Sequence, residues 1–356
     1  MTAAATTRVK LADVADIVMG QSPPSTSYNV DGIGLPFLQG KAEFGALSPR
    51  PVKWCSDPKK IAEPGCVLLS VRAPVGDVNI SDQRYCIGRG LAALVPGDNL
   101  DGQFLYYQLL TLRRWFESQS SGSIFQSINS GALYNLTLDL PDIQEQRRIA
   151  RILSTIQSAK THSQRVSAAL VALRKALFQT TMTGTSKWPT VRLGDEITLQ
   201  RGHDLPTQRR RQGPIPVISS SGVTGFHDEA KAYGPGVVIG RYGTLGSVTF
   251  VDGPYWPLNT TLYVKDFHGN NPSFVRFFLE TIEYASHNDK TSVPGVNRND
   301  LHALQVSWPP LREQTTIAMF LGTVASRIEV EASYEAAIEV LFASLLRELI
   351  DGDRRT

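Results

Sequence analysis

An internal duplication constrains this chain of 356 residues more than any other feature. Residues 129–178 return at 297–346 without a gap, and a weaker similarity joins residues 9–24 to residues 191–206. The ungapped copies share a Pro, a Glu-Gln pair and an Ile-Ala pair at matching positions. Such a long period has to be interpreted before any single site, because each copy is one structural unit. The repeat predicts two copies of a lobe followed by a helix, related by pseudo-two-fold symmetry.

The C-terminal part of each copy has the spacing of a long helix with one apolar side. From Ile149 to Leu177 the apolar positions alternate at intervals of three and four, with one polar position at Ser163. The second copy repeats this spacing around a charged break at Arg327 and Glu331. The predicted seam is Ile149, Ile152, Ile156, Val166, Leu170, Leu173 and Leu177 in the first helix and Ile317, Phe320, Val324, Tyr334, Ile338, Leu341 and Leu345 in the second. About 40 helical residues span about 60 Å, since the rise is about 1.5 Å per residue.

The two predicted helices carry opposite net charge. Residues 142–181 hold seven basic and two acidic side chains, whereas residues 310–350 hold three basic and six acidic ones. A helix of this length cannot bury its apolar seam alone, and opposite charges on the flanks favour pairing. We therefore expect the two helices to form an antiparallel coiled coil with one lobe at each end. The alternative is that each helix packs back on its own lobe.

The lobes have the pattern of mixed α/β domains. Short β-rich runs lie at residues 67–71, 91–95, 237–240, 248–251 and 262–264, and one helix per lobe is expected at residues 104–118 and 274–286. The predicted fold class is mixed α/β, with two globular domains in a pseudo-two-fold arrangement separated by the two long helices. The expected boundaries are 1–141 for the first lobe, 142–181 for its helix, 182–190 for a linker, 191–309 for the second lobe, 310–350 for its helix and 351–356 for a tail.

Composition excludes several classes of protein. Hydrophobic residues make up 42% and charged residues 19% of the chain, as in ordinary globular proteins. No apolar run reaches the length of a membrane span and the N-terminus lacks the apolar region of a signal peptide, so we expect a cytoplasmic protein. The three cysteines form no C-x-x-C pair and the six histidines have no ligand spacing, so we expect no metal site. Motifs for a methyltransferase, a P-loop, a nucleophile elbow or a nuclease are absent, and we expect no catalytic residues.

Polar residues in Gly-rich loops are the candidates for contacts to a partner. Arg, Lys, Gln and Asn can make paired hydrogen bonds to purine edges, while Ser and backbone amides suit phosphate. The candidates are Gln39, Lys41, Arg72, Arg89, Ser123 and Gln126 in the first lobe, and Arg209, Arg210, Arg211, Ser219, Ser220, Arg241, Asn259 and Arg298 in the second. For any one of them a solvated loop position is the more common role. The run Arg209 to Arg211 is interpreted as a solvated or phosphate-facing patch, and Asn129 with Asn297 is assigned a structural role in a turn.

The twice-repeated motif carries a family resemblance. It stands here as Pro141-Asp-Ile-Gln-Glu-Gln-Arg-Arg-Ile149 and Pro309-Pro-Leu-Arg-Glu-Gln-Thr-Thr-Ile317, each following a lobe and beginning a helix. In order, copy number and context the chain resembles the specificity subunit of type I restriction–modification systems over essentially its whole length. The motif is one residue longer here between Pro and Glu, and both lobes are electrically neutral. Neutral lobes predict that partner subunits supply much of the phosphate contact.

The resemblance implies a division of labour. Each lobe would read one half of a bipartite site on double-stranded DNA, and the paired helices would fix the gap and dock two modification subunits. Those methyltransferase subunits would bind S-adenosylmethionine and methylate adenine N6 after flipping the base from the duplex, and ATP-dependent restriction subunits would cleave unmethylated DNA. The chain itself would hold no cofactor and catalyse nothing. The alternatives are a coiled-coil scaffold that presents two protein- or ligand-binding lobes, and a fused enzyme active on its own.

Overall fold

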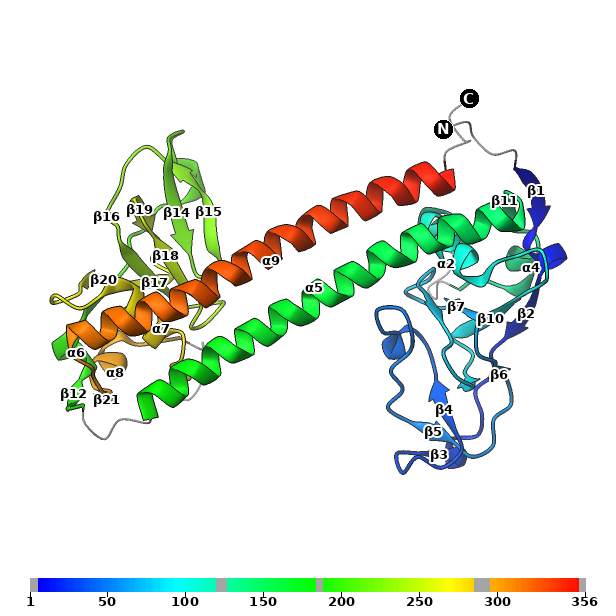
Figure 1. Ribbon diagram of the computed structural model, residues 1–356, viewed down its shortest axis with the longest axis horizontal. Helices are drawn as coiled ribbons and strands as arrows, with labels where there is room; N and C mark the ends of the chain where they lie inside the picture. Colours follow the sequence, from blue (N-terminus) through cyan, green and yellow to red (C-terminus); the bar gives the residue numbers. More distant parts are fainter. Residues whose placement is uncertain (1–5, 120–126, 184–187, 285–294, 352–356) are drawn as a thin grey trace. The chain divides into compact units, whose positions relative to one another are not determined.

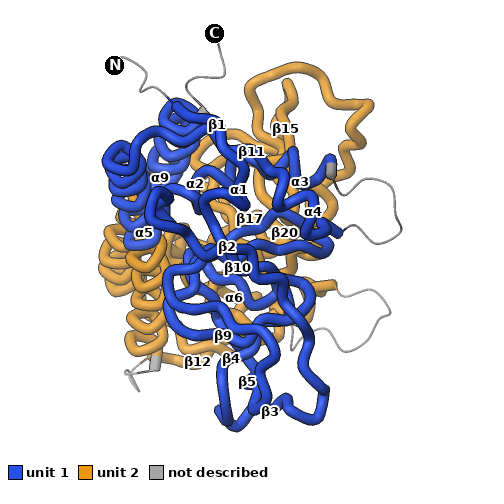
Figure 2. The backbone as a smooth tube through the Cα atoms, turned by 90° about the vertical axis from the view of Figure 1, so that its right-hand side faces the viewer, with its two compact units in different colours: residues 1–163, 334–356 blue, residues 164–333 orange. Residues whose placement is uncertain are grey.

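The computed structural model describes residues 6–119, 127–183, 188–284 and 295–351. They form two compact units, residues 1–163 with 334–356 and residues 164–333 (Figure 2). Both long helices, α5 (Ile143–Thr183) and α9 (Leu311–Asp351), cross the boundary between the units. Each unit therefore contains one lobe, part of the helix that follows that lobe, and part of the other helix.

The first lobe is built from a four-stranded and a five-stranded sheet. The four-stranded sheet has the order β2-β10-β7-β8, and the five-stranded sheet has the order β3-β5-β4-β9-β6. The strands of the first are β2 (Ala15–Met19), β10 (Leu91–Pro96), β7 (Val67–Ser70) and β8 (Val78–Ile80). Those of the second are β3 (Tyr28–Asn29), β5 (Trp54–Cys55), β4 (Leu35–Leu38), β9 (Tyr85–Ile87) and β6 (Ile61–Ala62).

Helices and a small strand pair complete the first lobe (Figure 1). The helices are α1 (Leu11–Val14), α2 (Gly102–Thr111), α3 (Arg113–Gln119) and α4 (Ser130–Tyr134), and β1 (Thr7–Lys10) pairs with β11 (Thr137–Leu140). The helix expected over residues 104–118 is thus two helices, because the chain turns at Leu112, where α2 ends. The lobe is mixed α/β, as predicted.

The central strands of the first lobe are buried on both faces. Val67 and Leu69 belong to the large core, which also contains α2, whereas Leu68 packs in a second cluster with Leu38 and Ile87. Successive side chains of a strand point to opposite faces. A strand covered on both sides is therefore apolar throughout, which is why these runs do not alternate in the sequence.

The second lobe repeats the same plan. Its four-stranded sheet has the order β13-β20-β17-β18, which matches β2-β10-β7-β8 strand for strand, and a second sheet has the order β15-β14-β19-β16. The strands are β13 (Thr198–Arg201), β20 (Thr261–Asp266), β17 (Gly236–Gly240), β18 (Val248–Val251), β15 (Gly222–His227), β14 (Ile215–Ser219), β19 (Pro254–Pro257) and β16 (Ala232–Tyr233). Both lobes also contain one parallel pair at the same place, β4 with β9 and β14 with β19.

The remaining elements of the second lobe follow the first lobe as well. They are α6 (Leu193–Glu196), α7 (Pro272–Leu279), α8 (Arg298–His302), and the pair of β12 (Thr190–Arg192) with β21 (Gln305–Ser307). The helix predicted for residues 274–286 begins two residues earlier and ends at Leu279. Over the described residues, no helix combines the length and apolar character of a membrane span.

The two long helices pack against each other in opposite directions within each unit. In the first unit Lys160 of α5 forms an ion pair with Glu339, while residues from Phe342 to Ile350 join the core that contains the start of α5 (Figure 1). In the second unit Phe178, near the end of α5, shares a core with Leu321, near the start of α9. Both packing alternatives are therefore combined, because each helix contacts the other helix and a lobe.

The structure corrects part of the predicted seam. Leu173, Phe320, Tyr334 and Leu341 are 48%, 58%, 53% and 49% exposed and do not lie in a buried line. The buried apolar positions of α9 in the second unit are instead Ala318, Leu321 and Ala325, each one residue after a predicted position. Small alanines allow close approach of neighbouring helices, and a seam chosen by the largest apolar residues passes over them. Ile149 and Ile338 are buried, and the other predicted members, Ile152, Ile156, Val166, Leu170, Leu177, Ile317, Val324 and Leu345, are half-buried.

This corrected seam predicts unequal effects of two neighbouring substitutions. Leu321→Ala should lower the free energy of unfolding by about 2–5 kcal/mol, because it leaves a cavity in a well-packed core. Phe320→Ala should change it by less than about 1 kcal/mol, since the ring lies mostly in solvent. Chemical denaturation of the full chain measures both. If Phe320→Ala lowers the free energy of unfolding more than Leu321→Ala does, the seam predicted from the sequence is correct at this position.

Candidate functional site

Loop ends from separate parts of the first lobe meet where β4, β7 and β9 end. Main-chain hydrogen bonds of 2.8–3.0 Å hold them together, from Gly88 N to Leu38 O, from Gln21 N to Ile87 O, from Val71 N to Gly90 O and from Ile128 N to Val71 O. Gln39, Arg72 and Arg89 stand in or next to these bonded segments and have exposed side chains. The structure therefore gathers three of the predicted contact residues into one group, which we call the first loop cluster.

Close main-chain packing explains the glycines of this cluster. A Cβ atom on Gly90 would lie 2.4 Å from Gln39 O, which no side chain could tolerate. The Arg89 side chain donates from Nε to Ser22 Oγ over 3.2 Å, so one of its guanidinium donors already has a partner within the lobe. The Arg72 guanidinium makes no ion pair with any residue that the structure describes. The cluster thus has a fixed main chain and cationic side chains available to a ligand.

The second lobe builds an equivalent group with the same bonds. They run from Leu258 N to Ile218 O, from His203 N to Pro257 O, from Arg241 N to Thr260 O and from Val296 N to Arg241 O, at 2.8–3.0 Å. Ser219, Ser220, Arg241 and Asn259 belong to these segments and form the second loop cluster. Ser219 takes the place of Gln39, and Asn259 takes the place of Arg89.

The side chains of the second loop cluster are oriented by their neighbours. The Arg241 guanidinium lies 4.6 Å from the centre of the Tyr242 ring, and its Nε donates to Val296 O over 3.2 Å. Asn259 Nδ2 donates to Asp204 Oδ1, as Arg89 does to Ser22 in the first lobe. A guanidinium stacked on an aromatic ring loses less conformational freedom when it binds a ligand. Arg241 is therefore held ready for a contact.

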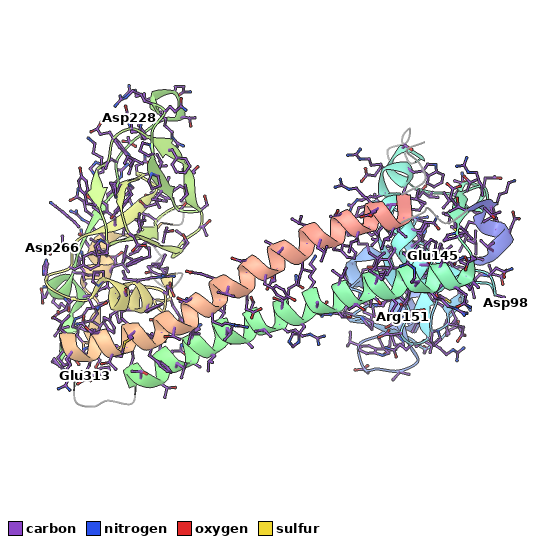
Figure 3. All side chains as sticks on the ribbon, turned by 45° about the horizontal axis from the view of Figure 1, so that its top comes forward. Asp98, Glu145, Arg151, Asp228, Asp266 and Glu313 are labelled. Atoms are coloured by element: carbon purple, nitrogen blue, oxygen red, sulfur yellow. The ribbon has the colours of Figure 1, made fainter. Side chains whose placement is uncertain are left out.

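Other candidates are engaged within their own lobe. Lys41 forms an ion pair with Asp77 at 2.7 Å, and Arg210 Nη1 donates to Thr224 O at 2.7 Å. Arg211 pairs at 2.7 Å with Asp228, which is labelled in Figure 3. The hydrogen bond from this guanidinium holds the pKa of the Asp228 carboxyl below its usual value. The Arg209 to Arg211 run is therefore not a uniform cationic patch. Only Arg209, on a short 3-10 turn, is exposed without an ion pair to a described residue.

The remaining predicted residues have mixed outcomes. Ser123 and Gln126 lie outside the described residues. Arg298 is exposed and begins α8, two residues after Val296 of the second loop cluster. The structural role predicted for Asn129 and Asn297 is confirmed, because each is the N-cap of a short helix and accepts a main-chain hydrogen bond.

Three residues that the sequence did not single out support the clusters. Ser22 accepts from Arg89, Asp204 accepts from Asn259, and the Tyr242 ring lies under Arg241. Ser22 and Asp204 lie in the segments 9–24 and 191–206 that resemble each other, so the repeat contained a signal for them. The described residues hold no group of three His, Cys, Asp or Glu side chains that could bind a metal ion.

Comparisons with known proteins agree on one family. The family model of the type I restriction modification DNA specificity domain matches residues 6–168 and 185–340. The MjaX specificity subunit of a type I restriction enzyme in Methanocaldococcus jannaschii is 40% identical over 169 residues, which cover 47% of this chain and 40% of that protein. The EcoprrI specificity subunit of Escherichia coli is 20% identical, and the match covers 74% of this chain and 71% of that protein.

A solved structure has the same fold over nearly the full length. The S subunit of the type I restriction–modification system from M. genitalium matches with a TM-score of 0.73 and 16% identity, covering 98% of this chain and 97% of that one. Among the curated relatives, the MjaX and MjaIX specificity subunits of M. jannaschii are matched over 40% and 52% of their length, so the chain spans about half of each.

A partly buried histidine of the second lobe predicts a pH dependence of stability. His302, at the end of α8, accepts a hydrogen bond at Nε2 from Leu199 N over 2.9 Å and has to be neutral there. Burial, with Arg298 and Arg192 nearby, lowers its pKa below the ordinary 6.5. The unfolded chain then binds more protons, so stability is fully present above pH 6.5 and is lost as the pH falls towards the folded pKa.

Thermal denaturation between pH 7 and pH 5 measures this effect. We expect His302→Gln, whose amide oxygen can accept the same hydrogen bond without titrating, to lose less stability than the wild type on acidification. His203, whose pKa is also lowered by burial, supplies part of the remaining slope. If stability falls with pH equally steeply in the variant and the wild type, His302 is not the cause of the pH dependence.

Proposed function

Because this chain belongs to the family of type I restriction modification DNA specificity domains, we propose that it reads a bipartite DNA site and directs partner subunits to it. The observation that carries the proposal is the pair of loop clusters. Two lobes whose β2-β10-β7-β8 and β13-β20-β17-β18 sheets match in strand order place polar and cationic side chains on equivalent main-chain frames. Two readers on one chain suit a target with two different halves.

Each loop cluster has side chains that can distinguish bases. Arginine can make paired hydrogen bonds to guanine, and Gln or Asn can do so to adenine. We assign base contacts to Gln39, Arg72 and Arg89 in the first lobe and to Arg241 and Asn259 in the second. Ser219, Ser220, Arg209 and Arg298 are assigned to phosphate, which positions the protein without reading sequence. Differences between the clusters then give the two half-sites different sequences.

The chemistry is assigned to the partners. Two modification subunits would bind S-adenosylmethionine and methylate adenine, restriction subunits would add cleavage, and this chain would need no cofactor. Exposed large apolar side chains on α9 support such assembly, since exposed apolar patches mark interaction sites. They are Leu311, Met319, Phe320 and Val330 in the second unit and, separately, Tyr334, Val340 and Leu341 in the first. The proposed role places the protein with the chromosome in the cytoplasm.

Mapping of N6-methyladenine across the native genome, with the gene present and deleted, tests the proposal. Deletion should remove methylation from one split motif with a fixed gap and from no other motif. If methylation is unchanged and no methyltransferase co-purifies with the chain, the proposed function fails. A coiled-coil scaffold with two protein-binding lobes would then become the better assignment.

Single arginines should control single half-sites. Arg72→Ala should weaken binding of the assembled complex to its site by about 1–3 kcal/mol and relax the sequence preference in one half only. Arg241→Ala should do the same in the other half. Arg84→Ala is the matched control, because Arg84 pairs with Glu63 and stands before β9, at the end opposite the loop cluster. Binding to randomised half-sites measures the preference, and relaxation in both halves by either variant would contradict the assignment.

A further inference from the structure

The duplicated motif at the start of each long helix contains a glutamine. DNA recognition by the loop clusters does not explain the role of this residue. Gln146 and Gln314 are the fourth residues of α5 and α9, and each is only 1% exposed. Figure 3 labels their neighbours Glu145 and Glu313 at these helix starts. A buried amide is costly unless its polar atoms are hydrogen-bonded. The partners of these two side chains therefore indicate their purpose.

In the first unit the Gln146 amide joins three parts of the chain. Its Oε1 accepts from Asp101 N at 2.9 Å, and its Nε2 donates to Asn99 O at 3.1 Å and to Pro141 O at 2.9 Å. Pro141 comes directly before the long helix, whereas Asn99 and Asp101 come directly before α2. One side chain thus ties the start of the long helix to the start of a lobe helix.

In the second unit the Gln314 amide repeats this arrangement. Its Oε1 accepts from Asn271 N at 2.9 Å, and its Nε2 donates to Pro309 O at 2.9 Å and to Asn270 Oδ1 at 2.6 Å. Asn270 Oδ1 also accepts from Trp308 Nε1 at 2.8 Å. Two of the three positions correspond, the N-cap and the proline. The third acceptor is the side chain of the residue directly before the N-cap here, and the main-chain carbonyl two residues before the N-cap in the first unit.

The residues that these glutamines hold continue the connection into the lobe. Asp101 and Asn271 are the N-caps of α2 and α7, accepting from Phe104 N and Phe274 N at 2.9 and 3.0 Å. Both helices pack in the core with the four-stranded sheet of their lobe. The central strands β7 and β17 of these sheets run directly into the loop clusters, towards Arg72 in the first lobe and Arg241 in the second. A continuous bonded and packed path therefore leads from each long helix to each loop cluster.

We propose that Gln146 and Gln314 are positioning residues that fix the angle between each lobe and its long helix, and so set the gap between the half-sites. This inference rests on the proposed function. A tilt of about 10° at a lever of about 20 Å moves a loop cluster by about 3.5 Å, which is roughly one base-pair step. A small loosening of the junction is therefore enough to admit a gap that differs by one base pair.

The test uses the full chain assembled with its methyltransferase subunits. A library of DNA sites with both half-sites intact and gaps from two base pairs shorter to two longer is methylated and sequenced. Gln146→Met and Gln314→Met should keep the half-site sequences but lower the preference for the native gap over its neighbours by about tenfold, the equilibrium weight of about one net hydrogen bond. Gln144→Met is the matched control, because Gln144 lies two residues away on α5 with an exposed side chain.

The outcomes separate the two proposals. If the wild-type complex methylates no split motif, the proposed function fails whatever the variants do. If the wild-type complex methylates only sites with one gap length, and both folded variants keep the full preference for that gap length, the positioning role is overturned. Should the Met variants unfold, Gln146→Asn and Gln314→Asn keep an uncharged amide but shorten its reach to its hydrogen-bond partners, and they enter the same assay. Hydrogen exchange of the main-chain amides of Asp101 and Asn271 then measures whether the hydrogen bonds at the junction persist. If the protection of these amides and the gap preference are both unchanged, the positioning role is overturned.

Discussion

Burial of the end of one long helix against the lobe of the other copy is the interaction on which each unit depends. Phe342 and the apolar residues that follow it pack into the core of the first unit, and the Phe342 ring lies 6.1 Å from that of Tyr107. Phe178 does the same in the second unit with Phe274. A lobe and its own helix would leave this core open to water. Neither sequence copy is therefore an independent domain, although the repeat alone could be interpreted as two.

Polar groups within the helix pair add specificity to this apolar packing. Ser163 and Glu331 are buried, Lys160 pairs with Glu339, and Arg174 pairs with Glu280 of the second lobe at 2.9 Å. Buried polar residues in a coiled coil fix the register at some cost in stability. The basic helix therefore finds acidic partners on the other helix and on a lobe, whereas its charge alone indicated only the other helix.

Main-chain hydrogen bonds define both loop clusters, which leaves their side chains free to differ. The same bonds hold Gln39 and Arg89 in one lobe and Ser219 and Asn259 in the other. A frame that does not depend on side chains can present different contacts without rearranging the fold. The glutamine junctions are the opposite case, because their function requires the same side chain in both copies.

The sequence by itself determined the duplication, the two long helices, the main strands such as β7 and β17, and a structural role for Asn129, because these depend on spacing and local chemistry. It also named most members of the loop clusters without their grouping. Only the tertiary structure decided that Ala318 and not Phe320 faces the core, that Lys41 and Arg211 are paired, and that Gln146 and Gln314 join helix to lobe. Such choices depend on contacts between residues distant in sequence, and no local pattern records which of several competing partners is closest.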